Sequence, residues 1–155
     1  MAIRNILTIG DETLRKKCRT VTAFDRKLFV LLDDMAETLH KSEGVGLAAS
    51  QIGVLRRVVV IDVGKGIIEL INPEIIKEKG VQETSEGCLS VPGKYGITRR
   101  PAFVTVKAKD RKGDEFEISG EELLAKALCH EIDHLNGTLF IDIVIRMLEP
   151  KELED

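Results

Sequence analysis

Aromatic side chains are scarce in this sequence, which has no tryptophan, one tyrosine and five phenylalanines. Proteins that bind single-stranded nucleic acids commonly stack the bases on exposed aromatic rings, so this mode of binding is not expected here. The formal net charge is −3, which gives no indication of a basic nucleic-acid-binding surface. Direct recognition of a nucleic-acid sequence is therefore not expected.

Long apolar runs are also missing. The longest, around "RVVVIDVG", is far shorter than the roughly 20 apolar residues that a transmembrane helix needs. The apolar run near the first residue is short and has no cleavage site after it, so no secretory signal peptide is expected. We therefore predict a cytoplasmic protein with no membrane contact. The 155 residues suit a single domain spanning 1–155, in which residues 144–155 form a polar, acidic tail.

The sequence has only three cysteines, Cys18, Cys88 and Cys129. An odd number of cysteines without a secretion signal argues against a disulfide framework. Cys18 lies in a basic, irregular stretch and is expected to be inert, and Cys129 is expected to be a small core residue. Cys88 lies in the turn-rich segment "SEGCLSVPG", where it is either a buried thiol or a thiolate bound to a metal.

Hydrophobic periodicity predicts two helices separated by short strands. The first helix is predicted to begin after Asp25 as N-cap and to end before Gly44. The segments "RRVVVIDV", "GIIELINP" and "EIIKEKG" read as short strands, and "AFVTVKAKD" with "FEIS" as an antiparallel hairpin. Ser119 and Glu122 match a capping box, which predicts a helix of about five turns ending at Gly137. The order predicts an α+β fold, with mostly antiparallel strands around a central helix.

The segment "HEIDH" places two of the three histidines four residues apart on the second predicted helix. His130 and His134 therefore share one helix face and can point at one ion, while Glu131 beside them can contact a water on that ion. The spacing alone leaves open that the two histidines are incidental. The flanks of the motif are apolar, however, and buried histidines and carboxylates need partners, which a metal supplies. The remaining histidine, His40, is expected at the surface.

A catalytic site of the zinc type needs a third protein ligand and one open position. In the metzincin pattern, the third ligand is a histidine six residues after the second one, but this chain has Phe140 there. The glutamates that remain downstream lie around Pro150 at the end of the chain, which is poor support for a ligand. The third ligand is therefore expected upstream, and Cys88 is a candidate.

Two structural roles are open for each of three further charged residues. Asp133 is either a carboxylate that supports the metal ligands or a solvated charge, and the second reading is favoured slightly. Glu86 and Arg100 either form an ion pair that braces the Cys88 loop or are two solvated charges, and the sequence does not separate these possibilities.

Three segments together resemble the signature motifs of the peptide deformylase family. They are "GVGLAASQ" (residues 44–51), "EGCLS" (86–90) and "HEIDH" (130–134), and they occur in the order typical of that family. The framing segments "VPG" and "LNGTLFID" are similar as well. The resemblance implies an α+β fold with the third motif on a central helix. It also implies a hydrolase that removes the formyl group from the N-terminal formyl-methionine of newly made bacterial proteins and releases formate.

The resemblance also implies a role for individual residues. Cys88, His130 and His134 would bind one divalent metal ion, natively Fe²⁺, with Zn²⁺, Ni²⁺ or Co²⁺ as substitutes. Glu131 would be the general base. Gln51, through its side-chain amide, and Leu89, through its backbone N–H, would donate hydrogen bonds to the oxyanion. These are the expected metal-binding and catalytic residues.

Substrate contacts follow from the same resemblance and from helix spacing. Val45 and Gly46 would line the groove for an extended N-formylmethionyl nascent peptide. Ala127 and Leu123, one and two turns before His130, are predicted to help line the methionine pocket. The resemblance further implies a transient contact with the ribosome near its exit tunnel. Some family members end in a basic docking helix, whereas this chain ends in "EPKELED", which puts that docking mode in doubt.

Three other functions compete with deformylation. A general metallopeptidase shares the H-E-x-x-H motif, but Phe140 removes its usual downstream ligand. A structural metal domain would need four protein ligands and gives no role to Glu131, and the sequence offers no good fourth ligand. A relative that binds without turnover is disfavoured because Gln51, Cys88 and Glu131 are all present. In the first motif, Ser50 stands where Pro or Thr is usual, which is a minor departure.

Overall fold

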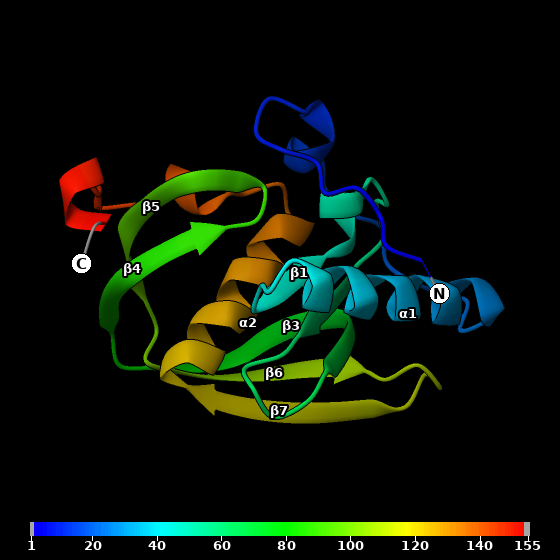
Figure 1. Cartoon of the computed structure of the whole chain (residues 1–155). Coiled ribbons are helices and arrows are strands. Elements are labelled where there is room, and N and C mark those ends of the chain that lie inside the picture. The colour runs from blue at the N-terminus through cyan, green and yellow to red at the C-terminus, as the bar shows by residue number, and fades with distance from the viewer. Residues whose placement is uncertain (1, 154–155) are drawn as a thin grey trace.

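The computed structural model of the chain describes residues 2–153 and has an α+β fold, which confirms the predicted class (Figure 1). Its longer helices are α1 (Arg26–Lys41) and α2 (Glu122–Leu135). Its strands are β1 (Gly46–Ala48), β2 (Val58–Ile61), β3 (Ile68–Lys79), β4 (Gln82–Cys88), β5 (Val91–Arg100), β6 (Phe103–Lys109), β7 (Glu115–Glu121) and β8 (Arg146–Met147). Short 3₁₀ helices cover Glu12–Arg15, Ala49–Ile52, Phe140–Asp142 and Pro150–Leu153.

The strands form two antiparallel sheets. One has five strands in the order β1-β2-β3-β6-β7, and the other has three in the order β4-β5-β8. The β4–β5 hairpin rises on one side of α2, while the five-stranded sheet lies beneath the helix (Figure 1). The helix that carries "HEIDH" therefore lies between the two sheets, as the central position predicted for it requires.

Strand β2 shows how the two helices share the core. All four residues of this strand are buried. Successive side chains of a strand point to opposite faces, so Val58 and Val60 pack in the cluster of α1, whereas Val59 and Ile61 pack in the cluster of α2. At the start of α1, Asp25 accepts a hydrogen bond from the backbone N–H of Leu28 at 3.2 Å, which confirms the predicted N-cap.

The predicted start of the second helix is wrong. Ser119 belongs to β7, and its hydroxyl is hydrogen-bonded to the hydroxyl of Thr105 at 2.8 Å, so it caps no helix. Helix α2 begins only at Glu122 and has 14 residues, which is about four turns. The cross-strand pair with β6 thus outweighs the local capping signal. At the other end, the C-cap is Asn136, and Gly137 follows it with a φ of 79°, the left-handed conformation that favours glycine at this position.

Two other segments differ from prediction. The strands predicted on both sides of "NP" form one continuous strand, β3. The pairing of β3 with β6 is irregular between Ile71 and Glu74, which marks a β-bulge. A β-bulge tolerates Pro73, which would interrupt a regular ladder. The apolar segment "LFIDIVI", which leads into the predicted tail, resembles a strand in its sequence, but the structure has the 3₁₀ helix Phe140–Asp142 there. Residues 154 and 155 of the predicted tail lie outside the described residues. Within residues 2–153, the helices are too short or too polar to cross a membrane.

Candidate metal centre and substrate pocket

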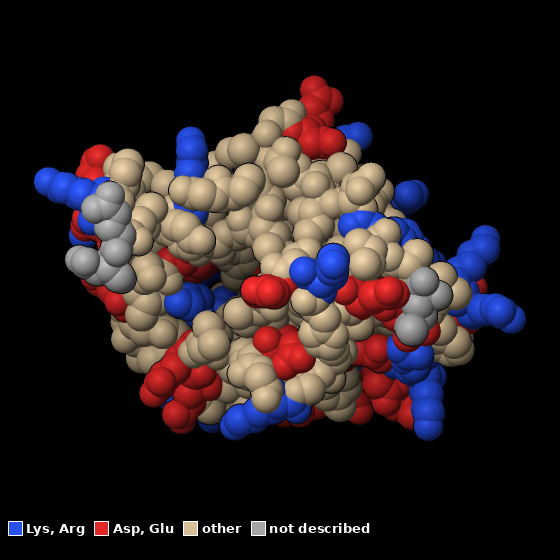
Figure 2. All heavy atoms as spheres, in the orientation of Figure 1, with Lys and Arg blue, Asp and Glu red and all other residues tan. Residues whose placement is uncertain are grey.

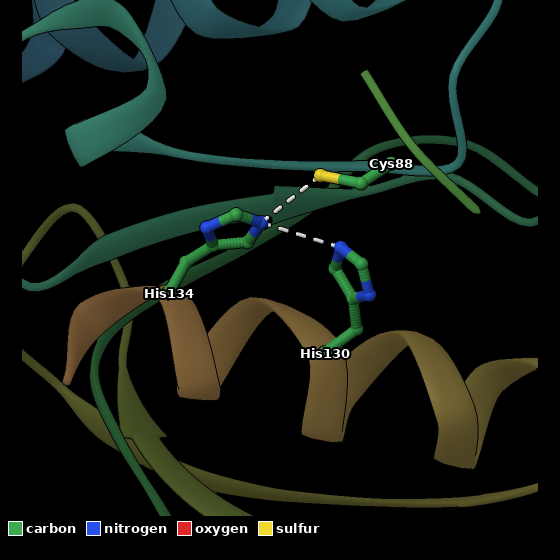
Figure 3. Close-up of side chains that lie close together, drawn as sticks. All are labelled: Cys88, His130 and His134. Atoms are coloured by element: carbon green, nitrogen blue, oxygen red, sulfur yellow. Dashed lines mark hydrogen bonds between the residues drawn. The ribbon is translucent and has the colours of Figure 1, made fainter. Parts of the chain in front are cut away.

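Two elements bring the three predicted metal ligands together. Helix α2 carries His130 and His134 on one face, and β4 ends at Cys88 opposite them (Figure 3). The Nε2 atom of His134 lies 3.3 Å from the Cys88 sulfur and 3.3 Å from the Nε2 atom of His130. All three donor atoms lie within 4.8 Å of one another.

The donor set fits a divalent transition metal. Two nitrogen ligands at 2.0–2.1 Å from a tetrahedral centre lie about 3.3 Å apart, which is the separation of the two Nε2 atoms. A thiolate with two imidazoles suits zinc or iron better than the hard cations magnesium or calcium. Three protein ligands also leave a fourth position for another molecule. The residues therefore form a possible metal site of the catalytic type.

A buried carboxylate orients His130. Glu86, on β4, is hydrogen-bonded to the Nδ1 atom of His130, which leaves Nε2 to face Cys88 and His134. Glu86 also accepts two hydrogen bonds from Arg100, at 2.7 and 3.1 Å, and both side chains are buried. Burial opposes ionisation of Glu86, but the hydrogen bonds from His130 and Arg100 outweigh it and lower its pKa to about 2. Of the two readings left open by the sequence, the ion pair is the correct one.

Asp133 is part of the same network. Its carboxylate accepts a hydrogen bond of 2.6 Å from Arg100, so the favoured reading of a merely solvated charge is wrong. The sequence could not reveal this contact, because Arg100 reaches Asp133 only after β5 has folded against α2. One guanidinium therefore joins the cysteine-bearing strand to the histidine-bearing helix, and its charge balances two carboxylates.

Glu131 lies next to the ligands in an almost closed environment. One of its oxygens is 3.9 Å from Nε2 of His130, and the other is buried without a hydrogen-bond partner among the described residues. Burial raises the pKa of Glu131 to about 7, although the charge of His130 lowers it. Burial and the proximity of His130 lower the pKa of His134, which favours the neutral form that a metal ligand requires. A carboxyl group with this pKa can exchange protons near neutral pH.

Gln51 is fixed with its amide NH₂ group directed toward Cys88. Its Oε1 atom accepts a hydrogen bond from the backbone N–H of Ala48 at 2.9 Å. Its Nε2 atom then donates to the hydroxyl of Ser90 at 3.0 Å and lies 3.6 Å from the Cys88 sulfur. The predicted donor is thus held in a defined orientation beside the site. Leu89 follows Cys88 in the turn between β4 and β5.

A cavity of about 460 Å³ opens beside these residues, and Figure 2 shows the surface hollowed between the β4–β5 hairpin and the rest of the molecule. The predicted substrate residues Val45, Gly46, Leu123 and Ala127 all line this cavity. Val45 and Leu123 are 37% and 45% exposed and form part of its apolar mouth, whereas Ala127 is buried. The structure thus brings these residues together with Cys88, His130 and Glu131.

Tyr95 and Lys126 are among the lining residues that sequence reasoning missed. The ring of Tyr95 packs on Gly87 so closely that a Cβ atom at Gly87 would come within 2.5 Å of it. Only the pairing of β4 with β5 reveals this contact. Lys126 had a signal in the sequence, since it lies four residues before His130 and three after Leu123, on the same helix face.

The remaining cysteines and histidine take no part in the site. Cys18 and Cys129 are buried, and burial raises the pKa of both thiols, so neither is a reactive thiolate. His40 is exposed and is hydrogen-bonded to Asp62 at 2.9 Å. These positions agree with the expectations for all three residues.

Three ligands with an open position, a neighbouring carboxylate and a substrate-sized cavity define the class of metallohydrolases. Comparisons with known proteins narrow this class. The model of the polypeptide deformylase family matches residues 3–149. The peptide deformylase of Thermoanaerobacter pseudethanolicus is 60% identical over 154 residues, which cover 99% of this chain and 97% of the relative.

Solved structures agree with this result. The peptide deformylase of Legionella pneumophila is 51% identical with a TM-score of 0.90, covering 97% of this chain and 89% of the other. The peptide deformylase of Synechococcus elongatus, solved in complex with actinonin, is 36% identical with a TM-score of 0.89, covering 97% and 81%. This chain belongs to the polypeptide deformylase family. It is a metal-dependent hydrolase that removes the formyl group from the N-terminal formyl-methionine of nascent proteins, and not a general metallopeptidase.

Proposed function

We propose that deformylation is carried out by the residues that converge on the cavity beside α2. Cys88, His130 and His134 would hold one divalent ion, natively Fe²⁺, which Zn²⁺, Ni²⁺ or Co²⁺ could replace. The observation that supports this proposal most directly is the close approach of the three donor atoms. The Cys88 thiolate makes the ligand set soft enough for iron or zinc. When bound, such an ion would supply Lewis acidity that makes hydroxide available near neutral pH.

Glu131 is the general base of this proposal. It takes the proton of the attacking water and later passes a proton to the leaving amine. Its burial beside His130 and its pKa of about 7 suit both steps. The oxygen that lacks a partner among the described residues is free to hold the water.

Gln51 and Leu89 stabilise the negative charge that grows on the formyl oxygen. The amide of Gln51 donates one hydrogen bond and the backbone N–H of Leu89 donates the other. Gln51 is suited to this role because Ala48 occupies its oxygen, so that the donor end of the amide faces Cys88. A neutral amide donates without competing for the proton that Glu131 handles.

The substrate binds in the cavity as an extended peptide. Gly46, on the edge strand β1, and Val45, directly before it, would face its backbone, and Leu123 and Ala127 would contact the methionine side chain. An edge strand can pair with an added strand, which is a common mode of peptide binding. The apolar character of Leu123 and Ala127 matches the thioether side chain.

The cellular setting follows from the substrate. Nascent formylated peptides emerge from ribosomes, so we propose a cytoplasmic enzyme that contacts the ribosome transiently near the exit tunnel. We also propose that residues 1–155 form a single domain, because β2 contributes to the clusters of both helices.

Formate release from a formyl-Met-Ala-Ser peptide tests the function. Protein purified without oxygen would be compared with Glu131→Ala, and the metal content of both would be counted. We expect release by the wild type alone, with about one metal ion bound per chain in both proteins. A metal-loaded wild type that releases no formate would contradict the proposal.

A further inference from the structure

The substrate cavity lies in a gap between the two sheets, and no backbone ladder among the described residues spans this gap. Within residues 2–153, strand β4 pairs only with β5 and is one of the two edge strands of its sheet. Helix α2, which forms the opposite wall, packs mainly on the five-stranded sheet. The width of the gap therefore depends on side chains that cross from α2 to β4.

Lys126 crosses this gap. Its ammonium group donates to the backbone oxygen of Ser85 at 2.9 Å and to the hydroxyl of Thr84 at 3.1 Å, both on β4. Ser85 lies three residues before Cys88, at the free edge of the strand. A charged donor on a carbonyl makes a stronger hydrogen bond than a neutral donor does. Lys126 therefore ties the strand that carries Cys88 to the helix that carries His130.

The side chain also forms part of the cavity wall. Leu123, Lys126, Ala127 and His130 have the spacing of one helix face, and all four line the cavity. Lysine commonly packs its methylene stem against apolar groups while its ammonium group reaches polar partners. Lys126 is the only lysine or arginine among the described residues that line the cavity. Its half-buried position and fixed ammonium group hold that wall in place.

We propose that Lys126 is a positioning residue that sets the width of the pocket for the first side chain of the substrate. This inference rests on the proposed function of the cavity. By holding β4 close to α2, Lys126 keeps the pocket narrow enough for an unbranched methionine side chain and too narrow for an aromatic ring. It acts through the position of β4 and takes no part in the chemistry.

The test compares Lys126→Met, which keeps the length of the stem but loses the ammonium group, with Lys126→Arg, which keeps a charged donor. Lys107→Met is the matched control, because Lys107 lies on β6 and its one ion pair among the described residues is with the exposed Glu115, at 3.7 Å. For each protein, kcat and KM are measured with formyl-Met-Ala-Ser and formyl-Phe-Ala-Ser. We expect Lys126→Met to lower the Met-to-Phe ratio of kcat/KM about tenfold, mainly through KM, as is typical of a changed side-chain pocket.

Lys126→Arg should restore most of the wild-type ratio, and Lys107→Met should leave it unchanged. Amide hydrogen exchange of residues 84–88 gives a readout that does not depend on turnover. We expect faster exchange there in Lys126→Met than in Lys107→Met, because β4 has lost its hydrogen bonds to Lys126, although the contacts of Glu86 with His130 and Arg100 remain. An unchanged Met-to-Phe ratio in Lys126→Met would overturn the inference even if exchange is faster. A wild type without formate release would instead overturn the proposed function. The exchange data would still show whether Lys126 holds β4 against α2.

Discussion

Gly46 lies directly against the carboxylate of Glu131. A Cβ atom at Gly46 would come within 2.5 Å of Oε2 and 2.8 Å of Cγ of that side chain. The backbone of Gly46 has no positive φ, so an alanine could adopt its conformation and the conflict is purely one of space. The glycine of the first motif therefore makes room for the glutamate of the third.

Replacing Gly46 by alanine should reduce catalysis by displacing Glu131. Loss of a positioned general base typically costs a factor of 10² to 10⁴, and a displaced base should cost about 100-fold in kcat for formate release. Metal content should remain at the wild-type level, because His130 and His134 are anchored separately on α2. Steady-state kinetics with formyl-Met-Ala-Ser and a metal count check both expectations.

The double variant Gly46→Ala/Glu131→Ala separates this mechanism from a blocked substrate groove. If alanine acts through Glu131, it should cost nothing further in protein that already lacks this carboxylate. An equal additional loss in both backgrounds would show that Gly46 acts on substrate binding instead.

Glu86→Gln should weaken metal binding. The amide cannot accept both hydrogen bonds from Arg100, and it removes the negative charge beside Nδ1 of His130. Changes to such supporting carboxylates typically lower metal affinity by about 10- to 100-fold. The melting temperature should also fall, because the charge of buried Arg100 is left with Asp133 alone as its partner. Competition with a chelator measures the affinity, and thermal unfolding measures the stability.

Glu83→Gln is the matched control for this change. Glu83 lies on the same strand and is paired with Arg99 at 2.8 Å, but both side chains are exposed. An exposed ion pair contributes only about 0–1 kcal/mol, so metal affinity and melting temperature should change little. Equal effects of the two substitutions would argue against a role for Glu86 at the metal site.

Gln51→Glu should lower kcat and leave KM nearly unchanged. The substitution replaces the amide donor by a carboxylate, which repels the developing oxyanion instead of stabilising it. Removal of one oxyanion donor typically costs a factor of about 10² to 10³ in kcat. Because the donor acts mainly in the transition state, ground-state binding of the peptide should be retained. A rise in KM with unchanged kcat would show that Gln51 contributes to substrate binding rather than to oxyanion stabilisation.

Local patterns in the sequence predicted the parts of the fold that depend on neighbouring residues. Asp25 as N-cap, the β6–β7 hairpin and the histidine pair are all encoded within a few residues, and the structure agrees with each. The start of α2 was predicted wrongly, because Ser119 bonds across the sheet to Thr105. Long-range pairing of β7 with β6 thus outweighed the capping signal.

The same distinction between local patterns and long-range contacts applies to the candidate site. The resemblance of three motifs to a family placed Cys88, His130 and His134 together, although Cys88 is far from the histidines in sequence. The crossing contacts were missed or left open, because the Arg100–Asp133 pair and the Lys126–Ser85 bond depend on how close β4 and β5 come to α2. Hydrophobic spacing specifies which face of a helix is buried, but this spacing does not specify which polar groups of other elements will contact that face.

Stability at low pH should depend on Asp34, which is buried on α1. Its carboxylate accepts hydrogen bonds from the side chain of Arg4 at 2.9 Å and from the backbone N–H of Ala2 at 2.7 Å. Burial opposes ionisation, but these bonds and the charge of Arg4 outweigh it, so the pKa of Asp34 is lower than usual. A carboxyl group with a lowered pKa stabilises the folded state above its unfolded pKa of about 3.9, and this stabilisation is lost as the pH falls through the folded pKa.

Asp34→Asn should therefore destabilise the protein by about 2 kcal/mol at pH 7 and by less near pH 2.5, because this pH lies below the unfolded pKa of about 3.9 and the stabilisation by the ionised carboxylate is already being lost there. Urea unfolding of both proteins at the two pH values measures this difference, and the comparison cancels any loss of metal in acid that both proteins share. Asp114→Asn, at an exposed position in the β6–β7 turn, should have little effect at either pH. A destabilisation by Asp34→Asn that is the same at both pH values would show that packing, and not the ionised carboxylate, holds the N-terminal segment on α1.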